Sequence, residues 1–438
     1  MLAAAIALAA CDANQPLKVK DPDVATPGSA SGFAALPYLR AGVLADFAVA
    51  FVGAGDQSNN GHEGIANLGG LMTDELTDYD TYTTRNSLNY RLAIPNNLNV
   101  ANVFRNLGAV HSDAVYAYSQ YQQFAPDSIG AAEVENIDGY VYILVAEHFC
   151  SGEPFSSINV GTGAVQNSPF LTTTQMFDTA LARFALAGQI AAKAQDPTQA
   201  GLALIGTARA QLDLGQIAAA ATTAAQIPAG YSYQVFESNN TQRQSNGVWQ
   251  YNINFQGFSV ADQKNTMGLP FATGGDPRVP ATLSAQPGSN GGGPFYNTGK
   301  YAAASTPMTL GDATEAQLIV AEGDIAAGDY AAGKAIMDNL RSTVGLAPLA
   351  AAATPKAQMQ QLLTERAYWM WVTGHRLGDW RRVLRPPYNQ APFSFVAGDV
   401  YPFGTSEFGP VISTSLEFPT PLYTNANPNY KACDPTIP

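Results

Sequence analysis

Residues 74–91 bring aromatic, amide and charged side chains together without the periodicity of a core helix or strand. Sugar rings present apolar faces that stack on tyrosine, and their hydroxyls form hydrogen bonds with amide and guanidinium groups. The candidate ligand contacts in this segment are Tyr79, Tyr82, Arg85, Asn86 and Tyr90. Taken one at a time, each is more often an ordinary surface or capping residue.

The same segment holds three carboxylates that are candidate calcium ligands, Asp74, Asp78 and Asp80. Their spacing lacks the glycine and the final bidentate glutamate of an EF-hand loop. Solvated carboxylates are therefore the simpler interpretation.

Residues 249–255 form a second candidate patch, in which aromatic or apolar side chains alternate with amides. Alternation is the period of a β-strand, which would place Trp249 and Tyr251 on one face and the amides on the other. The aromatic face would either be buried or form a platform for a ligand. Trp249 and Tyr251 are therefore also candidate ligand contacts.

Motifs for catalysis or metal binding are weak in this chain. Residues 328–335 nearly match a phosphate-binding loop but end in Ala335, where a hydroxyl is needed to bind magnesium. The four histidines lie far apart in the sequence, so we expect neither a metal nor another cofactor. Paired carboxylates of a glycan hydrolase are defined by their separation in space, so this class remains a minor alternative.

The composition indicates a large, well-buried globule with a polar and weakly charged surface. Of the 438 residues, 46% are hydrophobic and only 13% are charged, against about 25% in typical chains. The net charge of −13 disfavours nucleic acid, because phosphates require a basic surface. A neutral, hydrogen-bonding ligand such as a sugar or a peptide suits this composition.

Residues 364–382 place six charges among large aromatic side chains. Helical spacing would put packed side chains on most sides of this segment, so its charges are expected to be buried. An unpaired buried charge costs several kcal/mol, so we expect Glu365, Arg366, Arg376 and Asp379 to pair with one another or with backbone carbonyls. The segment is interpreted as an architectural clasp.

The clasp also carries a pattern of charged residues and glycine, namely Glu365-Arg366, Gly374, Arg376, Asp379 and Arg382. This pattern resembles the C-terminal signature of the SusD/RagB-like family of outer-membrane nutrient-binding lipoproteins. Further matches follow the family's order: a G-D-P-R turn at 275–278, an E-x-x-L-x-x-A-E helix at 315–322 and an N-P-x-Y close within 419–430. The resemblance implies a non-catalytic protein that captures a nutrient and passes it to a SusC-like TonB-dependent transporter.

The N-terminus independently suggests export. An apolar run at residues 2–10 leads into Leu8-Ala9-Ala10-Cys11, which fits the lipobox of bacterial lipoproteins. The run is too short to span a bilayer, so residues 1–10 are expected to be a signal peptide and Cys11 the acylated residue. Residues 11–30 would then form a tether from the outer membrane.

Besides Cys11, the chain has two cysteines, Cys150 and Cys433. In an exported protein such a pair is a candidate disulfide, and two unrelated thiols are the alternative.

Hydrophobic periodicity predicts a mainly α-helical fold. Helices are expected over residues 37–51, 99–123, 129–149, 173–194, 202–225, 314–344 and the clasp. The two segments 202–225 and 314–344 align around Gly215 and Gly328, as expected for tetratricopeptide-like hairpins of two closely packed helices. A loop-rich insertion with short strands, at about 231–301, separates them.

Together these features predict one globular domain over residues 31–438, exposed at the surface of the bacterial outer membrane. It would bind an oligosaccharide or a peptide and present it to the transporter. The alternative is a surface scaffold that holds other proteins through its helical repeats. An exposed aromatic strip in either patch would favour nutrient capture, whereas a dry core there together with an exposed apolar helical face would favour the scaffold.

Overall fold

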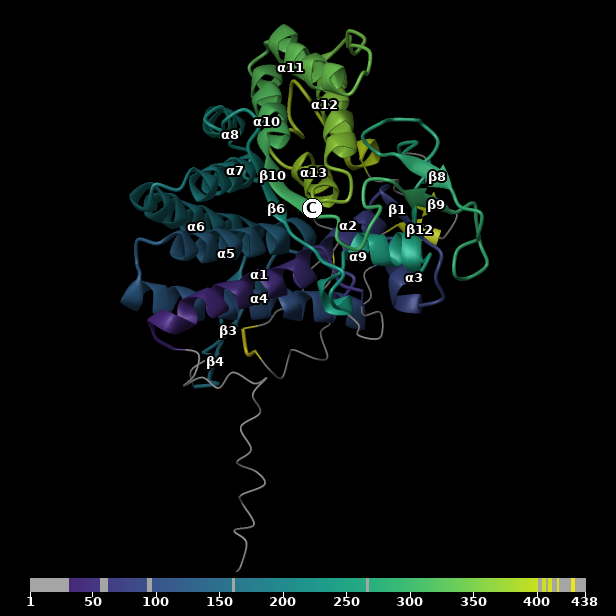
Figure 1. The fold of residues 1–438 in the computed structure, drawn as a ribbon. Helices are drawn as coiled ribbons and strands as arrows, with labels where there is room; N and C mark the ends of the chain where they lie inside the picture. Colours follow the sequence, from purple (N-terminus) through teal and green to yellow (C-terminus); the bar gives the residue numbers. More distant parts are fainter. Residues whose placement is uncertain are drawn as a thin grey trace, which may run out of the picture.

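The computed structural model describes residues 31–55, 62–92, 97–159, 162–264, 268–400, 404–406, 409–411, 416 and 427–429. Helices dominate, and the short strands β1, β8 and β9 gather beside α3 and α9, away from the helices α6 to α8 (Figure 1). The main helices are α1 (Leu36–Phe51), α2 (Ile65–Met72), α3 (Thr83–Asn89), α4 (Leu98–Phe124), α5 (Ile129–His148), α6 (Thr173–Ala194), α7 (Pro197–Asp213), α8 (Ile217–Ala224), α9 (Gly247–Trp249), α10 (Ala313–Ala326), α11 (Tyr330–Thr343), α12 (Pro355–Trp369) and α13 (Arg376–Arg382). The mainly helical fold is thus confirmed.

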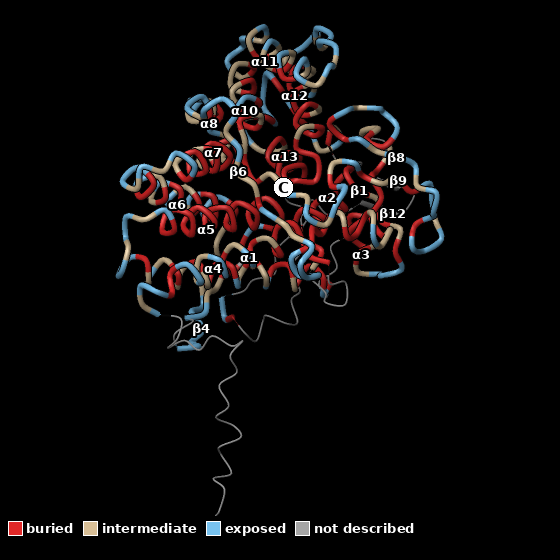
Figure 2. The backbone as a smooth tube through the Cα atoms, viewed as in Figure 1, coloured by how far each residue is buried: buried red, intermediate tan, exposed pale blue. Residues whose placement is uncertain are grey.

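Helix α5 is the centre of the core. Every residue of α5 after Ile129 is buried, as Figure 2 shows by its continuous red colour. Helices α1, α4, α6 and α7 surround it. Although α5 is covered on all sides, it carries six buried polar or charged residues, Glu133, Glu135, Asn136, Asp138, Glu147 and His148.

Helix α1 and the turn before it, Phe33–Phe51, are long and apolar enough to cross a membrane by length and composition alone. In the fold, however, α1 packs on α4 and α5, and its Phe47 and Phe51 rings stack at 5.5 Å and are buried. One face of this stretch therefore packs on the helical core, while residues such as Tyr38 remain exposed.

Two helical hairpins confirm the tetratricopeptide-like pattern. Helices α7 and α8 turn at Gly215, and α10 and α11 turn at Gly328, both with a positive φ of 73° and 85° that favours glycine. Helices α8 and α10 approach so closely that a Cβ on Gly323 would lie 2.4 Å from the Cβ of Ala221. Small residues therefore allow the hairpins to pack against each other.

The strands are short and pair two by two in antiparallel sheets. The pairs are β1 (Leu76–Asp78) with β7 (Phe258–Val260), β2 (Glu153–Pro154) with β5 (Phe170–Leu171), β3 (Ser157–Ile158) with β4 (Val165–Gln166), β6 (Ser232–Val235) with β10 (Met308–Asp312), β8 (Ala281–Leu283) with β9 (Tyr296–Thr298), and β11 (Gly404–Ser406) with β12 (Gly409–Val411). Most of the short strands in the predicted insertion pair with segments of the insertion itself or of its flanks.

The strand predicted at residues 249–255 is wrong, because this stretch is helical. It contains the end of α9 and the π-helical turn η4 (Gln250–Asn254). The side chain of Asn246 accepts a hydrogen bond from Trp249 N at 2.9 Å and so caps the start of this turn. The amide of Asn252 is buried and donates to Phe258 O at 2.7 Å and to Tyr296 O at 3.0 Å, which ties the turn to β7 and β9. Tertiary contacts therefore override the alternating pattern.

Cys150 follows α5, is buried and is disulfide-bonded. Its expected partner Cys433 lies outside the described residues, as do the acylation site Cys11, the signal peptide 1–10 and the tether up to residue 30.

Candidate functional site

The two predicted ligand patches meet in the fold. Strand β1 pairs with β7 in the register Leu76↔Val260 and Asp78↔Phe258. The pairing continues to Tyr79, whose backbone N donates to Gly257 O at 2.6 Å. Residues 74–91 therefore lie directly against the insertion, although the two are far apart in sequence.

Arg85 lies at the centre of this junction. Its guanidinium group lies 4.5 Å from the ring centre of Tyr82, 4.9 Å from that of Tyr251 and 5.8 Å from that of Phe258. Tyr251 in turn stacks on Phe258 at 4.8 Å. The result is a stack of π-systems that runs from the core to the surface, where the Tyr82 residue is 49% exposed.

The charge of Arg85 is balanced inside the protein. Its Nη2 and Nε donate to Glu63 Oε1 at 2.7 and 2.9 Å, and its Nη1 donates to Asp80 Oδ2 at 2.9 Å. Burial opposes the charged form of Arg85, but the nearby carboxylate of Glu63 favours it and raises its pKa above the ordinary value. Two buried carboxylates therefore pair with the single guanidinium under Tyr82, so the base carries no excess positive charge.

Local hydrogen bonds hold Tyr82 at the start of α3. Its backbone N donates to Asp80 Oδ1 at 2.7 Å, and its backbone is extended, with φ −79° and ψ 114°. The Asn86 amide donates to Asp80 O at 3.3 Å and to Tyr82 O at 3.2 Å. Asn86 thus positions the loop and is also partly exposed to solvent. Tyr90, at the end of α3, is half-buried.

Tyr79 is half-buried beneath the glycine-rich loop 287–294. Its ring meets Phe295 edge-on at 5.9 Å, and its carbonyl accepts from Asn290 N at 2.8 Å. A Cβ on Gly288 would lie 2.3 Å from Tyr79 Cβ, so this approach requires glycine. The abundance of glycine in the insertion was the sequence signal for this loop.

The predicted ligand contacts therefore differ in accessibility. Tyr82 is exposed, Tyr79, Asn86, Tyr90 and Trp249 are half-buried, and Arg85 and Tyr251 are buried. Arg85 and Tyr251 support the Tyr82 ring from behind and present no surface to a ligand. Glu63 and Phe258, which complete the stack, were missed because each reaches it only through tertiary packing.

The interpretation of Asp74, Asp78 and Asp80 as solvated carboxylates is wrong, because all three are buried. Asp74 binds Arg376 through two hydrogen bonds of 2.9 and 3.0 Å, and Asp80 binds Arg85. Among the described residues Asp78 has no ion pair of this kind, and burial, followed by the charge of Asp80, raises its pKa to about 8. Within the described ranges, no three His, Cys, Asp or Glu side chains gather in a way that could hold a metal ion.

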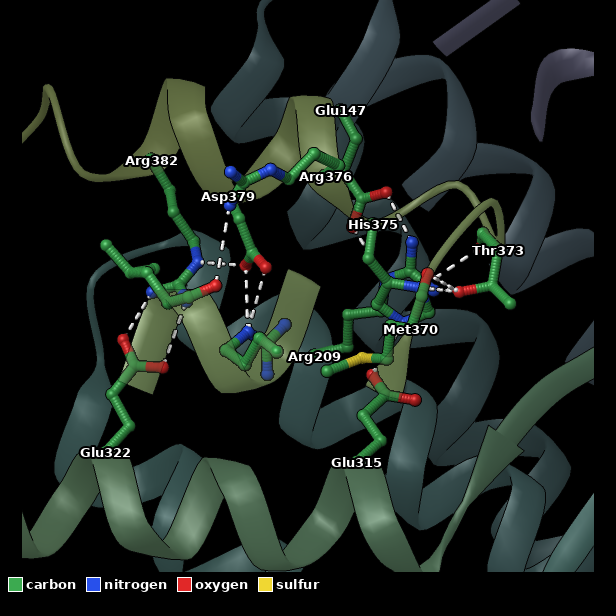
Figure 3. A network of polar contacts seen from close by, with 12 residues as sticks. Glu147, Arg209, Glu315, Glu322, Met370, Thr373, His375, Arg376, Asp379 and Arg382 are labelled. Atoms are coloured by element: carbon green, nitrogen blue, oxygen red, sulfur yellow. Dashed lines mark hydrogen bonds and ion pairs between the residues drawn. The ribbon is translucent and has the colours of Figure 1, made fainter. Parts of the chain in front are cut away.

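The predicted clasp is confirmed as a buried network of charges (Figure 3). Asp379 accepts hydrogen bonds from Arg366 Nε at 2.9 Å and from Arg382 Nε at 2.9 Å. Arg382 also holds Glu322, at 2.5 and 2.9 Å. Burial alone would raise the pKa of Asp379, but Arg366 and Arg382 hold it well below its usual range.

Of the four residues that were expected to pair with one another, Glu365 and Arg376 instead pair with side chains outside the clasp. Glu365 accepts from Arg278 Nη1 at 2.5 Å and from Arg341 Nη1 at 2.6 Å. Arg376 reaches back to Asp74. One network therefore joins the G-D-P-R turn, helix α10 and the clasp. Its residues are buried and paired with one another, as expected for a structural role.

Comparison with known proteins supports the fold. No protein-family model and no curated protein matches the chain. A SusD superfamily protein from Parabacteroides distasonis is similar over 91% of this chain and 98% of its own, with a TM-score of 0.67 and 13% identity. A SusD-like carbohydrate binding protein from Bacteroides vulgatus is similar over 83% of this chain and 84% of its own, with a TM-score of 0.61 and 12% identity. A SusD superfamily protein from the same species is similar over 93% of this chain and 100% of its own, with a TM-score of 0.61 and 16% identity. The chain therefore has the fold of the SusD/RagB superfamily.

Proposed function

We propose that this protein is a cell-surface lipoprotein that binds an oligosaccharide and delivers it to a SusC-like TonB-dependent transporter in the outer membrane. The SusD-like fold supports this proposal, and one protein with a similar structure is described as carbohydrate binding. The lipobox at Cys11 supports the location at the membrane.

The observation that carries the proposal is the exposed ring of Tyr82 on its buried base. One face of this ring lies over the guanidinium of Arg85, and about half of the residue is exposed to solvent. An aromatic ring that is already fixed loses little conformational entropy when a sugar stacks on it. Because the two carboxylates of Glu63 and Asp80 more than offset the charge of Arg85, the platform suits a neutral ligand better than an anionic one.

A binding assay on immobilised maltohexaose, xylohexaose, cellohexaose and mannohexaose tests this role of Tyr82. We expect one or more of these glycans to bind, and Tyr82→Ala to weaken that binding by at least tenfold because the stacking surface is removed. Tyr38→Ala is the matched control, because Tyr38 is an exposed tyrosine on α1, 80% accessible and on a different element.

Equal affinity of the Tyr82→Ala variant and the wild type would place the ligand elsewhere on the protein. A wild type that binds none of a wide panel of neutral glycans would refute an oligosaccharide as the cargo.

The transporter partnership is tested separately, by affinity purification of the acylated protein from membranes in mild detergent. Recovery of a TonB-dependent barrel in about equal amount is the expected result. Recovery of other surface proteins without a barrel would instead favour the scaffold.

A further inference from the structure

A groove of about 700 Å³ lies between α1, α5 and the segment that begins with β6. We call it the β6 groove. One wall is a helical face of α1 that includes Leu44, Phe47 and Ala48. The opposite wall consists of seven consecutive residues, 232–238. It lies on different elements from the Tyr82 platform.

The run of consecutive residues shows how the strand faces this groove. Successive side chains of a strand point to opposite faces. If the strand turned one face to the cavity, only every second residue would line it. All residues of β6 line it, and therefore the strand presents its edge. Among the described residues β6 pairs only with β10, which leaves its second edge toward the groove.

A free strand edge beside an apolar wall is the geometry of β-strand addition, in which an extended peptide pairs with the exposed backbone. The edge offers main-chain donors and acceptors, and the α1 wall offers apolar contact for alternate side chains of the added strand. The groove volume lies within the range of ligand-binding clefts, about 300–1,000 Å³.

The two arginines that line the β6 groove are paired, whereas one carboxyl group that lines it is not. Arg40 pairs with Glu133, which also accepts a hydrogen bond from Tyr233 at 2.6 Å. Arg243, at the other wall, pairs with Asp46. Glu237 has a buried Oε1 without a hydrogen-bond partner among the described residues, and burial raises the pKa of its carboxyl to about 8.

We propose that the β6 groove binds an extended internal segment of a partner protein, which adds to the free edge of β6 and places a lysine or arginine against Glu237. A basic side chain supplies the partner that Glu237 lacks. An internal segment is favoured over a free short peptide because the cations that line the groove, Arg40 and Arg243, already have carboxylate partners. A terminal carboxylate would therefore remain unpaired.

Fluorescence polarisation with short peptides tests the charge recognition. The probe is an acetylated and amidated heptapeptide of alternating valine and threonine with one central lysine, and its twin carries glutamate in place of the lysine. We expect the lysine peptide to bind at least tenfold more tightly. Glu237→Gln should reduce this preference to less than about threefold. Asp178→Asn, an exposed site on α6, removes the same charge and should leave the preference unchanged.

Main-chain pairing is tested with two versions of the lysine peptide, N-methylated on alternate sets of amides. One set should abolish binding and the other should preserve it, because only every second N–H of an added strand faces β6. Ala48→Phe should block the peptide by filling the groove, while Tyr82→Ala should leave peptide binding intact. The latter result separates this site from the proposed glycan site.

The proposal is overturned if the lysine and glutamate peptides bind the wild type equally, or if neither binds. Tighter binding of the same peptide with a free carboxylate would identify the occupant as a short free peptide. A dimer in sedimentation velocity that the capped peptide cannot dissociate would assign the edge to a second copy of this chain.

Discussion

At the scale of single residues, Glu75 is a carboxyl with an unusual environment. It is fully buried, accepts a hydrogen bond from Val372 N at 2.7 Å and receives no ion pair among the described residues. Burial raises its pKa from the ordinary 4.5 to about 7. Between these two pH values the folded protein therefore keeps this proton, whereas the unfolded chain has already released it.

The sign of the resulting pH dependence follows from proton binding. Between about pH 4.5 and 7 the folded state binds more protons at Glu75 than the unfolded state, so the contribution of Glu75 to stability falls as pH rises. Glu75→Gln keeps an acceptor for Val372 N and cannot ionise. We expect the free energy of unfolding of this variant, relative to the wild type, to increase by about 2 kcal/mol between pH 5.5 and 8.5.

Urea unfolding of both proteins at the two pH values measures this difference. Asp178→Asn, which removes an exposed carboxylate, should follow the wild type at both pH values. If the free energy of unfolding of Glu75→Gln changed with pH by the same amount as that of the wild type, Glu75 would already be ionised in the folded protein.

The residue types of the platform could be read from the sequence, but their roles could not. Tyr82 and Arg85 belong to the same short segment, and a pattern of types does not say which of them faces water. Their difference arises because Glu63, Tyr251 and Phe258 surround Arg85 from other parts of the chain.

At the scale of elements, helices α5, α6 and α7 pack around one ring. Phe184 of α6 lies between two glycines: a Cβ on Gly139 would lie 2.6 Å from Phe184 Cε1, and one on Gly206 would lie 2.4 Å from Phe184 Cζ. The ring also meets Tyr140 edge-on at 5.2 Å. The ring is therefore buried and closely packed.

Gly206→Ala should destabilise the protein by about 1–3 kcal/mol, because overpacking at Phe184 outweighs the better helix propensity of alanine. Gly188→Ala is the matched control on α6, where the nearest atom to an added Cβ is the Cβ of Ala203 at 3.7 Å. At that position only the better helix propensity of alanine acts, and we expect it to stabilise the protein by up to about 1 kcal/mol. Thermal unfolding of both variants measures the contrast, and equal shifts would contradict the packing account.

Local signals were sufficient for most helices. The predicted helix 173–194 is α6, and Thr172 and Gln175 form a capping box at its start, with hydrogen bonds of 3.2 and 2.9 Å. The failure at residues 249–255 has an equally physical cause, because the buried amide of Asn252 bonds two strands that no local pattern specifies.

At the scale of the whole molecule, buried ion pairs join distant parts of the chain. Asp74 and Arg376 are 302 residues apart and bind through two hydrogen bonds. Burial alone would raise the pKa of Asp74, but Arg376 lowers it below its ordinary value of 3.8. This stabilisation is present above about pH 4 and is lost as pH falls through the folded pKa.

A double-mutant cycle tests this long-range link. Asp74→Asn and Arg376→Met should each destabilise the protein by about 3–5 kcal/mol, since each leaves an uncompensated buried partner. The double variant should lose clearly less than the sum of the two. The exposed pair Lys193–Asp127, at 3.0 Å, should change stability by less than about 1 kcal/mol when either partner is replaced.

Chemical denaturation at pH 7 gives all of these values. Additive effects of the Asp74 and Arg376 substitutions would show that the two residues act independently, in spite of their contact.

The sequence by itself determined most of the helices, the two hairpins and the likeness to a known fold, because these depend on periodicity and on short motifs. It also determined that the charges of residues 364–382 needed partners. Only the tertiary structure decided which partners they have, that 249–255 is helical, and that Tyr82 is exposed while Arg85 and Tyr251 are not. These outcomes depend on contacts between segments far apart in the chain, and such contacts leave no local pattern to read.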